Sequence, residues 1–220
     1  MLRAVFLFLE PSTSAMTTPL SERPIGVFDS GVGGLTVMRA LVDRLPDESI
    51  TYLGDTARVP YGNRAAETVR RYAHNATDLL VDRGIKALVV ACNTASAYGL
   101  ATLIDTYDIP VVGVIDPVAR RAVEQTETGE IAVLGTRGTV RSRCYPEAVH
   151  RANPDIEVHQ VPSPLLVPLA EEGWLEGMVV EEVADHYVSQ LTGHPIDTVI
   201  LGCTHYPILR PALKRAADRA

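Results

Sequence analysis

The chain has 220 residues, of which 46% are hydrophobic and 21% charged, a composition that suits one or two compact globular cores. Its net charge is -7 and its basic residues are scattered, so no basic stripe favours binding to nucleic acid. The three cysteines form no C-x-x-C pair, which argues against a disulfide framework and a structural zinc site. This cysteine usage favours a reducing compartment, and we expect a cytoplasmic protein.

The N-terminal stretch differs from the rest of the sequence. Arg3 and the apolar run from Ala4 to Leu9 faintly resemble a signal peptide. The run is shorter than a signal-peptide core and much shorter than a membrane span. We therefore interpret residues 1–22 as a disordered or mis-annotated N-terminal extension, with Met16 as an alternative start, and expect no membrane association.

From Pro24 onward, short β-branched runs alternate with longer amphipathic segments. The expected strands cover residues 25–28, 50–53, 87–90, 111–114, 131–134, 156–158 and 199–201. The clearest helical patterns cover residues 35–45, 65–82 and 181–191, and another helix begins near Leu209. This alternation predicts an α/β fold of βαβ units, with mostly parallel sheets flanked by helices.

Two cysteine motifs suggest an internal duplication. Cys92 and Cys203 each follow a β-branched run and precede small polar residues. We therefore expect two similar α/β domains, each offering one thiol to an active site in the cleft between them. The first domain is predicted at 23–98, completed by 208–220, and the second at 99–207.

The positions of these cysteines favour reactivity over packing. A lone cysteine in a strand is most often a small buried apolar residue. Cys92, however, follows its strand, and its neighbours can cap a helix, so the helix dipole should favour the thiolate and lower the pKa of this thiol. Cys203 repeats the arrangement, with His205 as a candidate proton partner. Cys144 lies in a helical pattern and is assigned to packing or to the surface.

Two opposed thiols can invert a carbon centre. One thiolate removes a proton from one face of the carbon while the opposite thiol returns a proton to the other face, and the roles exchange in the reverse reaction. Because such a carbon is a weak acid, the site must also stabilise developing charge and exclude water.

The glycine-rich turn at 29–34 leaves another interpretation open. It resembles a dinucleotide-binding loop, and Asp55 could imitate the ribose-binding acid of that motif. Thr36, however, stands at the third glycine position, and Asp29 would place a carboxylate beside the phosphates. The same turn could instead bind a substrate carboxylate through backbone N–H groups, with Asp29 meeting an amine or helping a base.

His205 and Glu171 also have structural interpretations. His205 could be a core histidine bonded to backbone, and Glu171 with Glu172 could be a solvated helix start. These two residues and the paired cysteines include metal-ligating types, but no spacing typical of a zinc site supports a metal. We expect no metal and no cofactor.

Four motifs, in order, closely resemble the signatures of the glutamate racemases of the aspartate/glutamate racemase superfamily. They are Gly26–Val37 (GVFDSGVGGLTV), Gly54–Gly62 (GDTARVPYG), Ala91–Ala95 (ACNTA) and Leu201–Pro207 (LGCTHYP). The resemblance runs from about Pro24 to the chain end. Aspartate and hydantoin racemases share the paired cysteines but not the first motif.

The resemblance implies a cofactor-independent interconversion of L- and D-glutamate that supplies D-glutamate for bacterial peptidoglycan. It implies that Cys92 and Cys203 are the acid/base thiols, and that Asp29, His205 and Glu171 assist proton movement at them. The implied substrate-binding positions are Asp29, Ser30, Tyr61, Gly62, Asn93, Thr94, Thr136, Thr139, Thr204 and His205. It also implies a small-molecule substrate, glutamate, and a homodimer, without nucleic-acid or membrane partners.

The sequence departs from the family pattern in two ways. Ser163 stands where the family usually has cysteine, a change expected to affect packing. Family members also continue past the region of Ala220 with segments that complete the first domain. The alternatives are therefore an inactive or binding-only fragment, and a racemase for aspartate or another amino acid.

Overall fold

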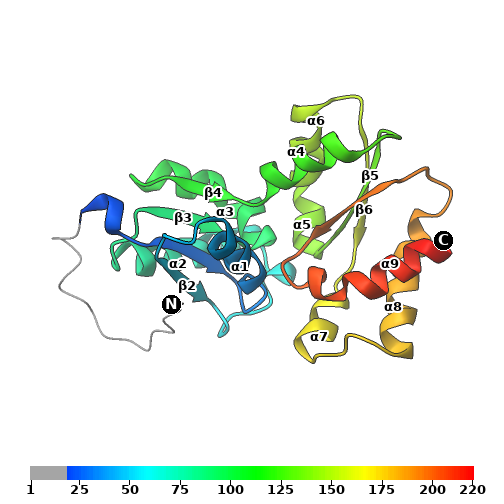
Figure 1. Cartoon of the computed structure of the whole chain (residues 1–220), viewed down its shortest axis with the longest axis horizontal. Helices are drawn as coiled ribbons and strands as arrows, with labels where there is room; N and C mark the ends of the chain where they lie inside the picture. The colour runs from blue at the N-terminus through cyan, green and yellow to red at the C-terminus, as the bar shows by residue number, and fades with distance from the viewer. Residues whose placement is uncertain (1–18) are drawn as a thin grey trace. The chain divides into compact units, whose positions relative to one another are not determined.

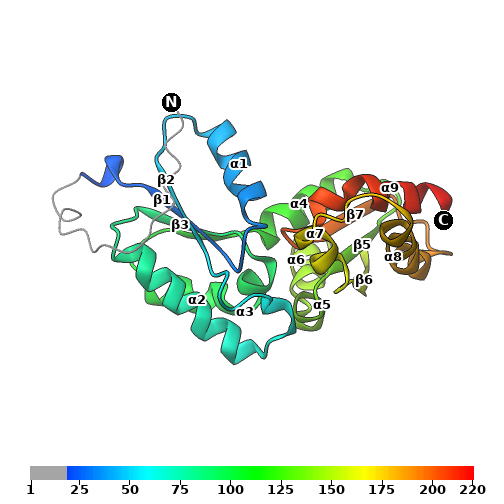
Figure 2. The same ribbon diagram turned by 90° about the horizontal axis from the view of Figure 1, so that it is seen from below.

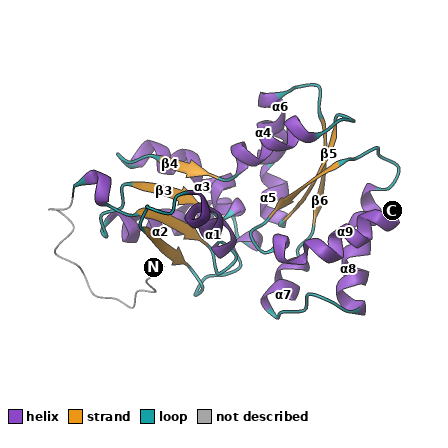
Figure 3. Cartoon of the chain, viewed as in Figure 1, coloured by secondary structure: helices purple, strands orange, loops and turns teal. Residues whose placement is uncertain are grey.

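The computed structural model describes residues 19–220, which form two compact units that divide between Val114 and Ile115 (Figure 1). Each unit contains one sheet in which all strands are parallel, and helices flank each sheet (Figure 3). Each of the seven predicted runs forms a strand, although the run expected at 156–158 is longer, at Glu157–Pro162. The predicted α/β class is therefore confirmed.

The first unit is built around β1 (Ile25–Asp29), in a sheet with the strand order β2-β1-β3-β4. The other strands are β2 (Ile50–Gly54), β3 (Ala87–Val90) and β4 (Val111–Gly113), and the helices are α1 (Leu35–Arg44), α2 (Ala66–Val81) and α3 (Asn93–Thr106). Figure 2 shows α1 on one face of this sheet and α2 and α3 on the other. Because β1 is central and covered on both sides, Val27 and Phe28 are fully buried.

Helix α2 shows why the predicted amphipathic segments fold as they do. Its residues Val69, Ala73 and Leu80 recur at helical spacing, and all three are fully buried. They join the first unit's core with Leu88 and Leu103. The apolar stripe therefore fixes the face that α2 turns toward the sheet.

The division between the units differs from the predicted boundary between residues 98 and 99. Helix α3 continues through that position, and β4 then pairs with β3 inside the first sheet. The prediction of a disordered or mis-annotated extension at residues 1–22 also needs correction at its C-terminal end, because Leu20–Glu22 form a 3-10 turn. Residues 1–18 of that extension lie outside the described range. The Ser21 carbonyl in this turn accepts a hydrogen bond from Lys86 Nζ at 2.9 Å.

The second unit repeats the order of the first three strands of the first unit. Its strands are β5 (Glu130–Gly135), β6 (Glu157–Pro162) and β7 (Thr198–Gly202), in the order β6-β5-β7. Its helices are α4 (Ile115–Gln125), α5 (Arg137–Ser142), α6 (Cys144–Ala152), α7 (Leu166–Glu171), α8 (Met178–Val188) and α9 (Arg210–Arg219). In Figure 1, α4 and α6 lie on one side of these strands and α8 and α9 on the other. In both units, the first strand lies between the second and the third, and a cysteine follows the third strand within two residues.

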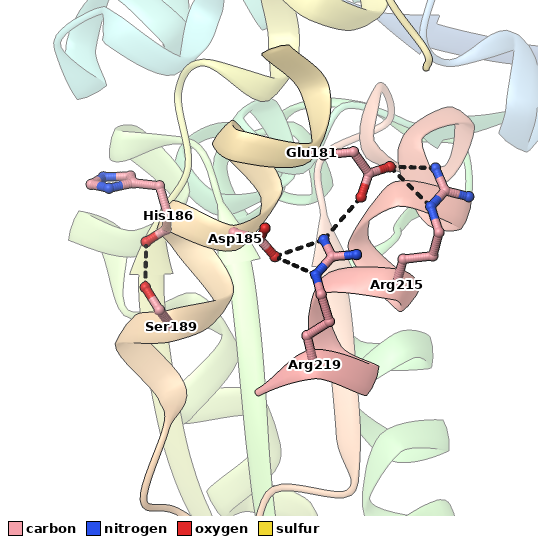
Figure 4. Close-up of polar contacts among 6 residues, drawn as sticks. All are labelled: Glu181, Asp185, His186, Ser189, Arg215 and Arg219. Carbon is pink, nitrogen blue, oxygen red and sulfur yellow. Dashed lines mark hydrogen bonds and ion pairs between the residues drawn. The ribbon is translucent and has the colours of Figure 1, made fainter. Parts of the chain in front are cut away.

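Helix α9 packs within the second unit, contrary to the prediction that residues 208–220 complete the first. Its buried residues join the core that α7 and α8 form: Ala212, Leu213 and Ala216. Arg219 forms ion pairs with Glu181 at 2.9 Å and Asp185 at 2.7 Å, and Arg215 also binds Glu181 (Figure 4). Because these charges are partly solvated, the apolar contacts contribute most of the packing energy.

No helix among residues 19–220 has the length and apolar character needed to cross a membrane.

Candidate active site

Cys92 lies at the start of helix α3, as its sequence context predicts. It is the N-cap residue, and its Sγ accepts a hydrogen bond from the Ala95 N–H at 3.4 Å. The same sulfur lies 3.4 Å from Ser30 Oγ, to which the thiol donates. Only 5% of Cys92 is exposed. We call Cys92, Asp29 and Ser30 the Cys92 site.

The environment of Cys92 raises its pKa, which corrects the expectation of a lowered value. Burial is the largest cause, and the negative charge of Asp29 adds to it, so that the pKa rises to about 11. Hydrogen bonds from Ser30 and Ala95 act in the opposite direction but do not compensate. The helix terminus was visible in the sequence, whereas desolvation and the nearby carboxylate were not. The thiol is therefore protonated at neutral pH.

The glycine-rich turn holds the Asp29 carboxylate. The Gly31 N–H donates to Asp29 Oδ2 at 3.0 Å, and a Cβ on Gly34 would overlap the Asp29 side chain. Tyr52 O–H donates to the Gly31 carbonyl at 2.7 Å, which ties the turn to β2. Because the turn directs a backbone donor to its own acid, its geometry argues against the dinucleotide-binding interpretation. No motif in the sequence indicates this role of Tyr52.

The other predicted substrate-binding positions of the first unit lie on two segments. Tyr61 and Gly62 are buried in the 3-10 turn Tyr61–Asn63, and Tyr61 O–H donates to Asp55 Oδ2 at 2.7 Å. Burial, followed by the bond to Asp55, raises the pKa of Tyr61, so its hydroxyl remains a donor. Asn93 and Thr94 are buried in the first turn of α3, next to Cys92 in the chain.

Cys203 has a different set of neighbours, which we call the Cys203 site together with His205 and Glu171. Cys203 follows β7 and is 7% exposed. Its Sγ lies 3.7 Å from His205 Nδ1, and His205 Nε2 lies 3.3 Å from Glu171 Oε1 at the end of α7. A short 3-10 turn, Tyr206–Leu209, separates this segment from α9. Cys203 therefore does not cap a long helix as Cys92 does.

The His205–Glu171 contact is an ion pair by distance but lacks hydrogen-bond geometry. Within the described residues, the buried His205 Nε2 has no hydrogen-bond partner. A small rotation of the Glu171 side chain, which is 36% exposed, would align the pair. In this arrangement the imidazole can accept the thiol proton, and the carboxylate can stabilise the imidazolium that forms.

Thr136 and Thr139 lie together at the carboxyl end of β5. Thr136 caps α5 by accepting a hydrogen bond from the Thr139 N–H at 3.1 Å, and the two hydroxyl oxygens are also 3.1 Å apart. Thr204, beside Cys203 in the chain, is 7% exposed. These predicted positions therefore lie on the same edge of the second sheet as the Cys203 site.

Ser163 and Cys144 have structural contacts. Ser163 is fully buried, donates to the Val161 carbonyl at 2.9 Å, and its own carbonyl accepts from Tyr206 O–H at 2.7 Å. Cys144 is the first residue of α6, and its thiol donates to the Thr139 carbonyl at 3.8 Å. Both fit the predicted packing roles.

The sequence and fold place this chain in a class of racemases. Residues 25–219 match the sequence pattern of the Asp/Glu/hydantoin racemase family, so the chain belongs to that family. Within the family, a glutamate racemase from Geobacter metallireducens is 54% identical over 188 residues, which cover 86% of this chain and 70% of the relative.

Solved structures of glutamate racemases have the same fold. One from Bacillus anthracis is 44% identical with a TM-score of 0.86, covering 89% of this chain and 73% of that protein. Another, from Francisella tularensis in complex with D-glutamate, is 39% identical with a TM-score of 0.84, covering 90% and 74%.

Proposed function

We propose that this chain interconverts L- and D-glutamate without a cofactor, with Cys92 and Cys203 acting on opposite faces of the substrate α-carbon. The observation that carries the proposal is the matched placement of two buried thiols. Each follows the third strand of its sheet, next to the central strand, and each has a polar partner within hydrogen-bonding range. The similarity to glutamate racemases supports glutamate as the substrate.

In this mechanism, one cysteine acts as a thiolate and takes the α-proton while the other, as a thiol, donates a proton to the opposite face. For Cys203, His205 accepts the thiol proton and Glu171 stabilises the imidazolium that forms. For Cys92, the nearby Asp29 carboxylate accepts the thiol proton and so loses the negative charge that raises the thiol's pKa, and Ser30 stabilises the thiolate by hydrogen bonding. Substrate binding close to each thiol would replace water and hold the α-carbon in line with both sulfur atoms.

We assign substrate binding to polar groups near the two thiols. The residues are Asp29, Ser30, Tyr61, Gly62, Asn93, Thr94, Thr136, Thr139, Thr204 and His205. Hydroxyl, amide and backbone N–H groups suit the two carboxylates of glutamate, and Asp29 suits its ammonium group. The biological role that we propose is the supply of D-glutamate for peptidoglycan. In this proposal the enzyme acts in the cytoplasm and forms a homodimer.

Proton NMR in deuterated water tests the activity directly. Purified protein is mixed with L-glutamate, and loss of the α-proton signal is followed together with a chiral assay for D-glutamate. We expect both changes without added cofactor. Stabilisation by glutamate with neither exchange nor D-glutamate would instead indicate a binding-only protein, and turnover of aspartate alone would reassign the substrate.

A further inference from the structure

A cluster of metal-ligating side chains lies at the opposite end of the second sheet from Cys203. Glu130, His159 and His194 each offer one ligand atom, and these atoms lie within 4.8 Å of one another. Glu130 begins β5, whereas Gly135 at its other end pairs with Gly202, the residue before Cys203. Glu130 and Gly135 are five positions apart along the strand, which places the two ends about 16 Å from each other. The cluster is therefore distinct from the Cys203 site.

The strand register brings two of these residues together. Glu130 pairs with Glu157, and Ala132 pairs with His159, so Glu130 and His159 project from the same face of the sheet. His194 reaches the same place from the segment before β7. This convergence was not visible in the sequence, because the three residues are far apart in the chain and match no spacing of a zinc motif.

The distances suit a first-row divalent metal ion. Glu130 Oε2 lies 2.9 Å from His159 Nε2 and 3.6 Å from His194 Nδ1. Bonds of about 2.0 to 2.1 Å in a tetrahedral zinc site place neighbouring ligand atoms about 3.3 Å apart. The imidazole rings of His159 and His194 pack against each other, with centroids 4.0 Å apart and planes tilted by 42°. All three ligand atoms already lie within 4.8 Å of one another, so rotation of the side chains alone can bring both nitrogens and the carboxylate onto one ion.

The cluster is partly buried yet accessible. The side chains of Glu130 and His159 are 19% and 15% exposed, while that of His194 is 46% exposed and leaves a path for an ion. Glu157 Oε1 lies 3.7 Å from His159 Nε2 and is within reach as a fourth ligand, a position that water can also fill.

The backbone around the cluster is held in place by Asp197. Its carboxylate accepts hydrogen bonds from Thr126 Oγ1 at 2.7 Å and from the backbone N–H groups of Glu127 and Thr128 at 2.6 and 3.0 Å. These contacts fix the segment that follows His194 onto the turn that leads into Glu130. A pre-ordered backbone lowers the entropy cost of assembling three ligands.

We propose that Glu130, His159 and His194 form a binding site for a divalent transition-metal ion, with zinc as the best-fitting ion. Bound metal would link the segment before β7 to β5 and β6, and so stabilise the second unit. The site has no part in the proposed proton transfers. Its test therefore does not depend on racemase activity.

Zinc titration of the chelator-treated full chain, followed by calorimetry and thermal unfolding, tests the site. We expect one saturable zinc equivalent and a rise in the unfolding temperature of about 5 °C at a hundredfold excess of zinc over Kd. His159→Gln and His194→Gln should each weaken zinc binding at least about tenfold. The matched control is His186→Gln, which alters an exposed histidine of the same unit and should bind zinc normally.

Zinc also binds thiolates, so Cys92→Ala and Cys203→Ala are titrated in parallel and should retain the site. Unfolding temperatures measured without zinc show whether each histidine variant is folded. Absence of saturable binding below about 1 mM zinc, with no rise in the unfolding temperature, would overturn the proposal. Undiminished binding in either histidine variant, or loss of binding in a cysteine variant, would do so as well.

Discussion

The two cysteine sites share a scaffold but not a chemical environment. In each unit, the first strand lies between the second and the third, and the cysteine follows the third strand, directly in the second unit and after one residue in the first. Cys92 then meets the hydroxyl of Ser30 and the charge of Asp29 at the start of a long helix. Cys203 meets the imidazole of His205, which contacts Glu171. The repeated strand order sets where each thiol lies, and side chains from other elements set how its proton is held.

This difference is compatible with a near-symmetric reaction. The two enantiomers of an amino acid have equal free energies in water, so any variant must lower kcat/KM equally in both directions. The two proton transfers can nevertheless have unequal barriers, because one thiol loses its proton beside an imidazole and the other beside a carboxylate. Variants should therefore show which site limits the reaction.

The largest expected effect comes from removing either thiol. Cys92→Ala and Cys203→Ala should each reduce racemisation at least about 1,000-fold, because each thiol serves one face of the carbon and neither can replace the other. Circular dichroism of the product measures the rate, and the unfolding temperature checks the fold. Cys144→Ala is the matched control and should retain activity within about threefold, since the polar contacts of the Cys144 thiol, with the Thr139 carbonyl and with Ser142, are local to the start of α6. Normal two-way turnover by either single-thiol variant would contradict the two-thiol mechanism.

Much of the fold could be predicted because its signals are local. Each β-branched run between amphipathic segments forms a strand, and the spacing of residues such as Val69, Ala73 and Leu80 fixes a helix face. The N-cap position of Cys92 was equally local, since small polar residues follow the strand directly. The unit boundary was missed because strand pairing, which keeps β4 in the first sheet, depends on non-local contacts.

The electrostatics of the sites could not be predicted from local pattern. Burial, which dominates the raised pKa of Cys92, depends on residues that surround it only after folding. Glu171 was aligned with His205 only through resemblance, because α7 and the segment after β7 are distant in the chain. The Glu130–His159–His194 cluster also depends on non-local contacts, here the pairing of β5 with β6, and no motif in the sequence indicated it.

An intermediate effect is expected at the Cys203 site. His205→Asn should lower kcat/KM about 100-fold in both directions, because Cys203 loses its proton acceptor while the thiol remains. The proton transfer at Cys203 should then become slower than that at Cys92. Deuterium at the α-carbon of D- and L-glutamate should therefore give unequal isotope effects on the two rates.

The control for this variant is His150→Gln. His150 belongs to the same unit, and its Nε2 lies 3.1 Å from the Ile156 carbonyl. Its kcat/KM should stay within about threefold of the original. Equal isotope effects for the two enantiomers in His205→Asn would mean that His205 does not act specifically at one thiol.

The smallest expected effects are shifts in the pKa of Cys92, and their signs test how its proton is held. Asp29→Asn removes a negative charge that raises this pKa, so the pKa should fall from about 11. Ser30→Ala removes a hydrogen bond that stabilises the thiolate, so the pKa should rise. Each shift should be about one pH unit. The pH dependence of iodoacetamide alkylation, followed at each cysteine by mass spectrometry, measures both thiols in one sample.

Cys203 is the internal control in this experiment, because Asp29 and Ser30 belong to the other unit. Opposite shifts at Cys92 with no change at Cys203 would establish that each unit sets the protonation of its own thiol. Shifts of the same sign at Cys92 would contradict the assigned roles of Asp29 and Ser30. A parallel shift at Cys203 would mean that the two thiols interact, so that their pKa values belong to the pair and not to separate sites.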